Sequence, residues 1–208
     1  MAQANSRGVW RCLSILAIVL GAASSAQAGP ATDQLKDDLG RVFRVIEDTS
    51  VERAGAAGID LSARRDAIRT AATPGFDWRE MASRSLGRHW QPRSEAERVE
   101  FVLVFGDFIH RAYITQLERY SGEAIKFISE RVEADLALVN TRFVSKLGQE
   151  TPVDYRLINR DGRWRVYDVV VEGVSLVGNY RTQFDKVIRT SSYPDLVKRL
   201  RDKDVASR

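Results

Sequence analysis

The chain has 208 residues, one cysteine, and 32 Lys and Arg against 28 Asp and Glu, which gives a formal net charge of +4. This length suits one domain with a sizeable core, and the small charge excess argues against a nucleic-acid-binding protein, which would carry a concentrated basic stripe. A single cysteine excludes a scaffold held by disulfides.

Residues 1–28 have the features of a secretory signal peptide. Arg7 and Arg11 precede an apolar stretch at 12–23, and the triplet 26–28 (Ala-Gln-Ala) is a small-residue cleavage site. The apolar stretch is shorter than the roughly 20 residues that cross a bilayer, and Cys12 stands at its start, where it cannot serve as a lipoprotein anchor. We predict cleavage after Ala28, which leaves one exported domain at 29–208 with a net charge of +2 and no cysteine.

Helical spacing recurs along the next 60 residues. An amphipathic helix is expected from Thr32 to about Ile46, and the stretch 55–58 (Gly-Ala-Ala-Gly) breaks it. Ser62 is expected to cap a second helix that ends near Ala72. After a turn at 74–75, a short helix is expected to carry Phe76, Trp78, Met81 and Leu86 and to end at Gly87.

A long apolar helix is predicted to begin at a capping box formed by Ser94 and Glu97 and to end at 121–122. Apolar residues at the helical period include Val99, Val102, Leu103, Ile109, Tyr113 and Leu117, and Phe101, Val104, Phe105 and Phe108 widen the apolar surface. Such a helix must be covered on more than one side, or it lines a cavity.

Beyond Gly122 the hydrophobic period becomes alternating. Strands are expected at 124–132, 137–146, 153–159 and 164–172, with a hairpin turn at 159–162 (Asn-Arg-Asp-Gly) and two final helices. Strands joined by short turns form an antiparallel meander. The predicted fold is therefore an α+β domain in which helices pack on a curved four-stranded antiparallel sheet.

Catalytic chemistry is sparse. There is no phosphate-binding glycine loop, His89 and His110 are the only histidines, and Ser175 lacks the second glycine of a nucleophile elbow. We therefore predict no enzyme, no catalytic residue, no metal and no cofactor, and we interpret His110 as a structural histidine.

Asp168 and Glu172 deserve a closer look because residues four apart in a strand point to the same face. They could form a pair of carboxylates in a pocket, with one acting as a general base. The favoured alternative is that they face solvent or pair with arginines such as Arg165 or Arg181. Apolar residues at 164–171 alternate imperfectly, so either a bulge re-aims this strand or both of its faces are covered.

The segment 151–184 (TPVDYRLINRDGRWRVYDVVVEGVSLVGNYRTQF) resembles the signature segment of the MlaC family. The segments 76–90 (FDWREMASRSLGRHW), 94–105 (SEAERVEFVLVF) and 117–123 (LERYSGE) are also similar to that family, so the resemblance runs from about 76 to 203. A related branch is linked to hopanoids, but 172–177 and 179–181 fit the phospholipid branch better.

The resemblance implies a monomeric periplasmic carrier with a cone like the nuclear transport factor two fold and an apolar cavity that holds a glycerophospholipid by its acyl chains. It implies two partners, an outer-membrane lipoprotein-porin complex and an inner-membrane ABC transporter with a substrate-binding ring. Transport between them maintains the lipid asymmetry of the outer membrane, and the family's toluene-tolerance label describes membrane integrity.

Our candidate lipid-binding residues come from the long helix, from the last two strands and from the segment after them. They are Phe105, Phe108, Ala112, Tyr113, Leu117, Val153, Tyr155, Leu157, Trp164, Val166, Tyr167, Val169, Val171, Val174 and Leu176.

Two other functions stay open at this point. An isomerase-like or dehydratase-like cavity enzyme on the same fold would require Asp168, His110 or Glu172 buried together. A pure interaction module would have a cavity too small for an acyl chain. The arginines at 79, 84, 88 and 93 form a basic neighbourhood that could face an acidic partner, although a solvated face is the plainer interpretation.

Overall fold

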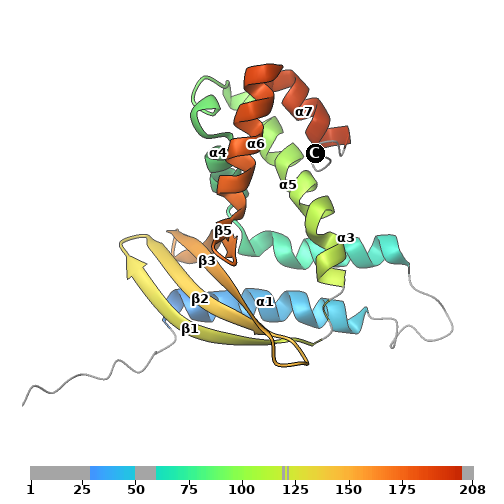
Figure 1. Cartoon of the computed structure of the whole chain (residues 1–208), viewed down its shortest axis with the longest axis vertical. Helices are drawn as coiled ribbons and strands as arrows, with labels where there is room; N and C mark the ends of the chain where they lie inside the picture. Colours follow the sequence, from blue (N-terminus) through green and yellow to red (C-terminus); the bar gives the residue numbers. More distant parts are fainter. Residues whose placement is uncertain (1–28, 50–59, 119, 121, 203–208) are drawn as a thin grey trace, which may run out of the picture.

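A computed structural model describes residues 29–49, 60–118, 120 and 122–202, so the predicted signal peptide lies outside the described residues. The helices are α1 (Pro30–Asp48), α3 (Leu61–Ala72), α4 (Trp78–Leu86), α5 (Glu95–Glu118), α6 (Leu176–Thr190) and α7 (Tyr193–Asp202), with short 3-10 turns at Thr73–Gly75 and Gly87–His89. The strands are β1 (Ala124–Glu133), β2 (Leu136–Val144), β3 (Glu150–Arg160), β4 (Arg163–Val171) and β5 (Val174–Ser175). Helices precede and follow one antiparallel sheet in the order β1-β2-β3-β4-β5, which confirms the predicted α+β class (Figure 1).

The sheet has one strand more than predicted. The strand β5 spans only two residues, which is too short to show an alternating pattern in the sequence. The hairpin turn between β3 and β4 is confirmed, because Asp161 and Gly162 both have positive φ angles and the amide of Gly162 donates to the side chain of Asn159 at 3.1 Å.

Most predicted helix ends are confirmed. Ser94 and Glu97 form the predicted capping box at the start of α5, with N···O distances of 2.8 and 3.3 Å. Gly87 ends α4 at φ +56°. The prediction that Ser62 caps α3 is wrong, because the Asp60 carboxylate accepts from the amides of Ser62 and Ala63 at 2.9 and 3.1 Å. A carboxylate two residues earlier satisfies the free amides of the first turn and also complements the helix dipole.

A β-bulge in β4 decides which side chains share a face of the sheet. Arg156 pairs with Asp168 and Leu157 pairs with Val166, so Tyr167 is the extra residue. Tyr167 and Asp168 therefore both point away from α1, although they are neighbours in the chain. This bulge is one of the two arrangements expected for the imperfect alternation in this strand.

Figure 1 shows α1 lying along one face of the sheet. The helices α4, α5, α6 and α7 stand together above the sheet in this view. The face of the sheet that packs against α1 is called the inner face below. No helix within the described ranges has the combination of length and apolar character that a membrane span requires.

Candidate apolar binding site

The apolar interior is divided into three clusters. The helix cluster joins α4, α5, α6 and α7 around Phe101, Phe105, Phe108, Tyr180 and Phe184. The sheet cluster joins α1 to the inner face through Ala31, Leu35, Ala137, Val139, Tyr155, Leu157, Trp164 and Val166. The amino-terminal cluster joins α1 to α3 through Val42, Ile46, Ile68, Ala71 and Ala72.

Phe76 is the residue at which the three clusters meet. Its side chain packs against all of them and yet is only partly buried. Its position is fixed by the main chain, because Phe76 forms a parallel bridge with Val166 and the amide of Asp77 donates to the Val166 carbonyl at 2.9 Å. A large ring held at this junction without full burial leaves part of its apolar surface uncovered where the three clusters meet.

The sequence analysis placed Phe76 on a helix, but it precedes α4 in extended conformation with φ −114°. A signal for this position was present. Asp77 is followed three residues later by Glu80, and Asp77 is the N-cap of α4, accepting from the Glu80 amide at 2.9 Å. An apolar residue directly before such a cap lies outside the helix.

A row of valines crosses the inner face at the end of β4, five residues beyond Val166. Val153 of β3 pairs with Val171 of β4, which in turn pairs with Val174 of β5. Directly paired residues share a face, and Val153 lies two residues from Tyr155, so the row belongs to the inner face that α1 covers further along. Burial falls along the row: Val153 is partly buried, whereas Val171 and Val174 are 42% and 62% exposed.

The predicted lipid-binding residues therefore fall into three groups. Val153, Val169, Val171 and Val174 form the least covered part of the inner face, and Tyr155, Leu157, Trp164 and Val166 are its buried part. Phe105, Phe108, Tyr113 and Leu176 belong to or pack on the helix cluster, Leu117 packs on the amino-terminal cluster, and Ala112 is partly buried on α5. Tyr167, which the bulge turns to the face opposite the valine row, is a buried member of the helix cluster, and the Arg84 guanidinium lies 4.2 Å from its ring centroid.

The long helix α5 is covered on more than one side, as its apolar surface required. Phe101 and Phe105 pack into the helix cluster, while Ile114 and Leu117 pack on the amino-terminal cluster. Its amino-terminal half keeps two uncovered apolar side chains, since Val99 and Leu103 are 49% and 65% exposed.

His110 of α5 belongs to the apolar surroundings of Phe76. The Trp78 ring lies between them, with centroids 5.2 Å from Phe76 and 4.9 Å from His110. Burial, with a smaller contribution from the nearby Arg69 cation, lowers the pKa of His110 to about 4. His110 is thus a neutral ring at neutral pH that packs against the Trp78 indole at an interplanar angle of 43°.

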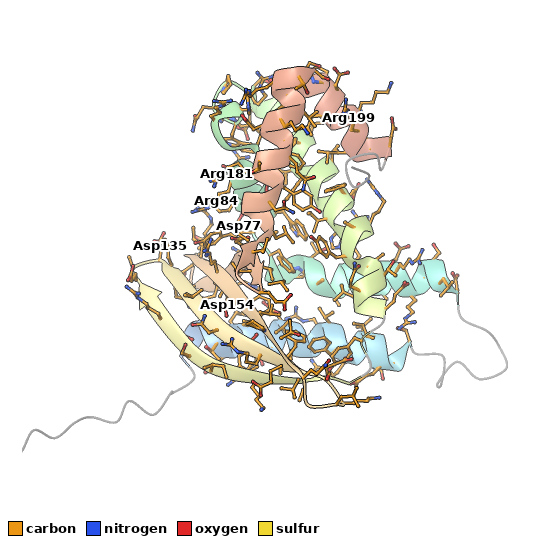
Figure 2. All side chains as sticks on the ribbon, in the orientation of Figure 1. Asp77, Arg84, Asp135, Asp154, Arg181 and Arg199 are labelled. Atoms are coloured by element: carbon orange, nitrogen blue, oxygen red, sulfur yellow. The ribbon has the colours of Figure 1, made fainter. Side chains whose placement is uncertain are left out.

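A polar network lies next to Phe76, around the carboxylate of the following residue, Asp77. The buried Asp77 carboxylate accepts from Arg160 at 2.7 Å, and Arg160 also donates to Glu80 at 2.8 Å. Together with Trp78, Arg79, Ser83, Trp90 and Arg165, these residues and Phe76 line a surface cleft of about 500 Å³. Figure 2 shows Asp77 where the upper helices meet the sheet, with Arg84 nearby. The predicted enclosed apolar cavity stays a prediction.

Asp168 and Glu172 do not form a pair of carboxylates, which agrees with the interpretation that the sequence favoured. Asp168 is 1% exposed and accepts from Arg156 at 3.0 Å, from the Ser175 hydroxyl at 2.7 Å and from the Val177 amide at 3.0 Å. Glu172 is exposed in the turn between β4 and β5 at φ +50°. Asp168 thus connects β4 to the start of α6. Its cation partner is Arg156 and not Arg165 or Arg181, the two arginines that the sequence analysis suggested.

Each arginine of the predicted basic neighbourhood has an acidic partner. Arg79 pairs with Glu95, Arg84 with Glu80, Arg88 with Asp185, and Arg93 with Glu97, at 2.6 to 3.2 Å. This neighbourhood is therefore a set of separate ion pairs. Across the described ranges, no three His, Cys, Asp or Glu side chains gather where they could hold a metal ion.

Comparisons with known proteins agree on one family. The model of the family described as MlaC protein matches residues 40–202. An intermembrane phospholipid transport system binding protein MlaC from Haemophilus influenzae is 29% identical over 118 residues, which span 54% of this chain and 55% of that protein. The match therefore spans about half the length of this curated relative.

A solved structure shares the fold. It is a phospholipid-binding protein from Ralstonia solanacearum in complex with a phospholipid, and it superposes with a TM-score of 0.73 at 22% identity over 86% of this chain and 98% of that one. At this identity the likeness establishes the arrangement of helices and sheet.

Proposed function

Because this chain belongs to the MlaC family, we propose that it is a phospholipid carrier of the periplasm. In this proposal the signal peptide is cleaved after Ala28, and the mature single domain is a monomer that takes a diacyl lipid from one membrane to the other. Its partners are an outer-membrane lipoprotein-porin complex and an inner-membrane ABC transporter with a substrate-binding ring, and its activity maintains outer-membrane lipid asymmetry.

The observation that carries the proposal is the uncovered apolar end of the inner face, which the valine row forms. The inner face ends in Val171 and Val174, which are 42% and 62% exposed, and Phe76, where the three clusters meet, is only partly buried. The Ralstonia solanacearum protein, with the same fold, was solved in complex with a phospholipid. Acyl chains are a ligand suited to such a surface, because they offer hydrocarbon without any polar group to satisfy.

The energetics explain why a carrier is needed. Two acyl chains contain roughly 30 methylenes, and at about 0.8 kcal/mol for each buried methylene their exposure to water costs on the order of 24 kcal/mol. Free phospholipid therefore cannot cross an aqueous compartment at a useful rate. A protein surface that shelters the chains nearly as well as a bilayer permits transfer with only a small difference in affinity at each docking partner.

The chemistry of the site supports carriage over catalysis. The buried carboxylate of Asp168 accepts from three donors on the face opposite the valine row, and His110 is a neutral ring that packs at a tilt against Trp78. The enzyme alternative required these groups buried together with Glu172, which is exposed.

The proposal is tested by placing a charge in the valine row. Val171→Glu and Val174→Glu alter exposed positions, so we expect both variants to fold. A carboxylate there would have to be desolvated against an acyl chain, so each variant should bind a fluorescent phospholipid at least about tenfold more weakly.

Leu147→Glu is the matched control, because Leu147 is 89% exposed in the turn between β2 and β3 and lies outside the three clusters. This variant should bind lipid as the unchanged protein does. Equal binding by all three variants would place the lipid elsewhere and refute the proposed site.

A further inference from the structure

Glu130 of β1 is a partly buried carboxylate without a cation partner among the described residues. Its Oε2 accepts from the amide of Thr32, in the first turn of α1, at 2.6 Å. The fully buried acids differ in this respect, since Asp38, Asp77 and Asp168 each pair with an arginine. Glu130 therefore has a helix terminus beside it and no balancing positive side chain.

The carboxylate of Glu130 lies directly against the main chain of Gly29, the N-cap residue of α1. A Cβ atom built on Gly29 would lie 2.6 Å from Cδ of Glu130 and would also collide with Oε1. The carbonyl of Gly29 accepts from the Asp33 amide at 3.0 Å, so the N-cap residue is held in place by the first turn of the helix. Glycine permits the contact because it has no side chain in the path of the carboxylate.

We propose that Glu130 is the binding site for the α-ammonium group that signal-peptide cleavage creates at Gly29. Cleavage after Ala28 hydrolyses the peptide bond to Gly29, so the neutral amide nitrogen becomes a cation beside a carboxylate that lacks one. The proposal rests on the export and cleavage proposed above and is independent of lipid carriage.

The location of the new charge makes a counter-ion necessary. The N-terminus of a helix carries a partial positive charge, so an ammonium group at the N-cap of α1 is repelled. Glu130 offsets this repulsion, and it accepts from the helix at the same time through Thr32. Processing thus converts a half-satisfied carboxylate into one with both a helix amide and a cation.

The other charged groups around this end of α1 are already paired. Asp33 and Lys36 pair with each other on α1 at 3.6 Å, and Arg131 and Glu133 pair with each other further along β1. The pair with Glu130 should raise the pKa of the Gly29 amine in the folded state above its value in the unfolded chain. Its stabilisation is then fully present below the unfolded pKa and is lost as the pH rises through the folded one.

The experiment uses the processed protein purified from the periplasm. Intact mass should give a chain that begins at Gly29, and NMR titration should give its amine a pKa above that of an exposed α-amine. Glu130→Gln should remove this increase and lower the melting temperature at pH 7 by about 2 °C. Glu133→Gln, in the same strand and exposed, is the control and should leave the pKa of the amine unchanged.

A second form of the protein separates the ion pair from the helix cap. In a chain that retains residues 26–28, the nitrogen of Gly29 is a neutral amide, so Glu130→Gln should have a smaller effect on the melting temperature than in the processed chain. An equal effect in both forms would show that Glu130 acts on the helix alone and would overturn the proposal. A mature mass that begins at another residue would overturn it as well, whatever the lipid content of the protein.

Discussion

Replacing Asp168 by alanine should lower the free energy of unfolding by about 3 kcal/mol. The Val177 amide would be left buried without an acceptor, which costs about 1–3 kcal/mol, and the bond from Ser175 would add about 1 kcal/mol. Arg156 is 46% exposed and contributes at most about 1 kcal/mol. For a domain of this size the melting temperature should fall by about 6–12 °C, which thermal and urea unfolding followed by circular dichroism would measure.

Two further variants show whether the carboxylate is responsible. Asp168→Asn keeps one acceptor oxygen for the Val177 amide, so it should lose about half as much stability. Glu150→Ala removes an exposed acid that pairs with Lys126, so it should lower the stability far less than Asp168→Ala does. If Asp168→Ala were as stable as Glu150→Ala, the connection from β4 to α6 would not depend on this residue.

The remaining predictions concern His110 and two glycines. The pKa of His110 is about 4, below its ordinary value, so the stability it contributes is present above about pH 6.5 and is lost as the pH falls toward 4; an NMR titration with a midpoint near 6.5 would contradict this. Gly87→Ala should destabilise the protein by about 1–3 kcal/mol, because residue 87 has φ +56° and its new Cβ would lie 3.2 Å from Arg181. Gly40→Ala, inside α1 with only Arg44 within reach, should instead stabilise it by about 1 kcal/mol, and urea unfolding of both variants would check the opposite signs.

The sequence predicted those parts of the fold that depend on local pattern. The α5 capping box, the end of α4 at Gly87 and the β3–β4 hairpin follow from short-range chemistry, and all three are confirmed. The strand β5 was missed because two residues cannot show a period. Asp60 was missed as the cap of α3 because Ser62, two residues later, was an equally acceptable capping residue by type.

The candidate site depends on contacts that are distant in sequence, and here prediction was weaker. Alternation indicated which β3 and β4 residues are apolar, but the bulge at Tyr167 reverses the faces beyond it, so Tyr167 was grouped with the inner valines. The central position of Phe76 results from three clusters whose members lie as far away in the chain as Leu200, which no local pattern encodes. The same holds for Glu130, whose partner on α1 is 98 residues away in the chain.

Native mass spectrometry of protein purified from the periplasm, followed by organic extraction, tests the proposed lipid carriage most directly. The account predicts that the folded protein carries extra mass matching one diacyl phospholipid, and that extraction releases it. A fully folded protein that emerges from the periplasm without any bound lipid would contradict the account.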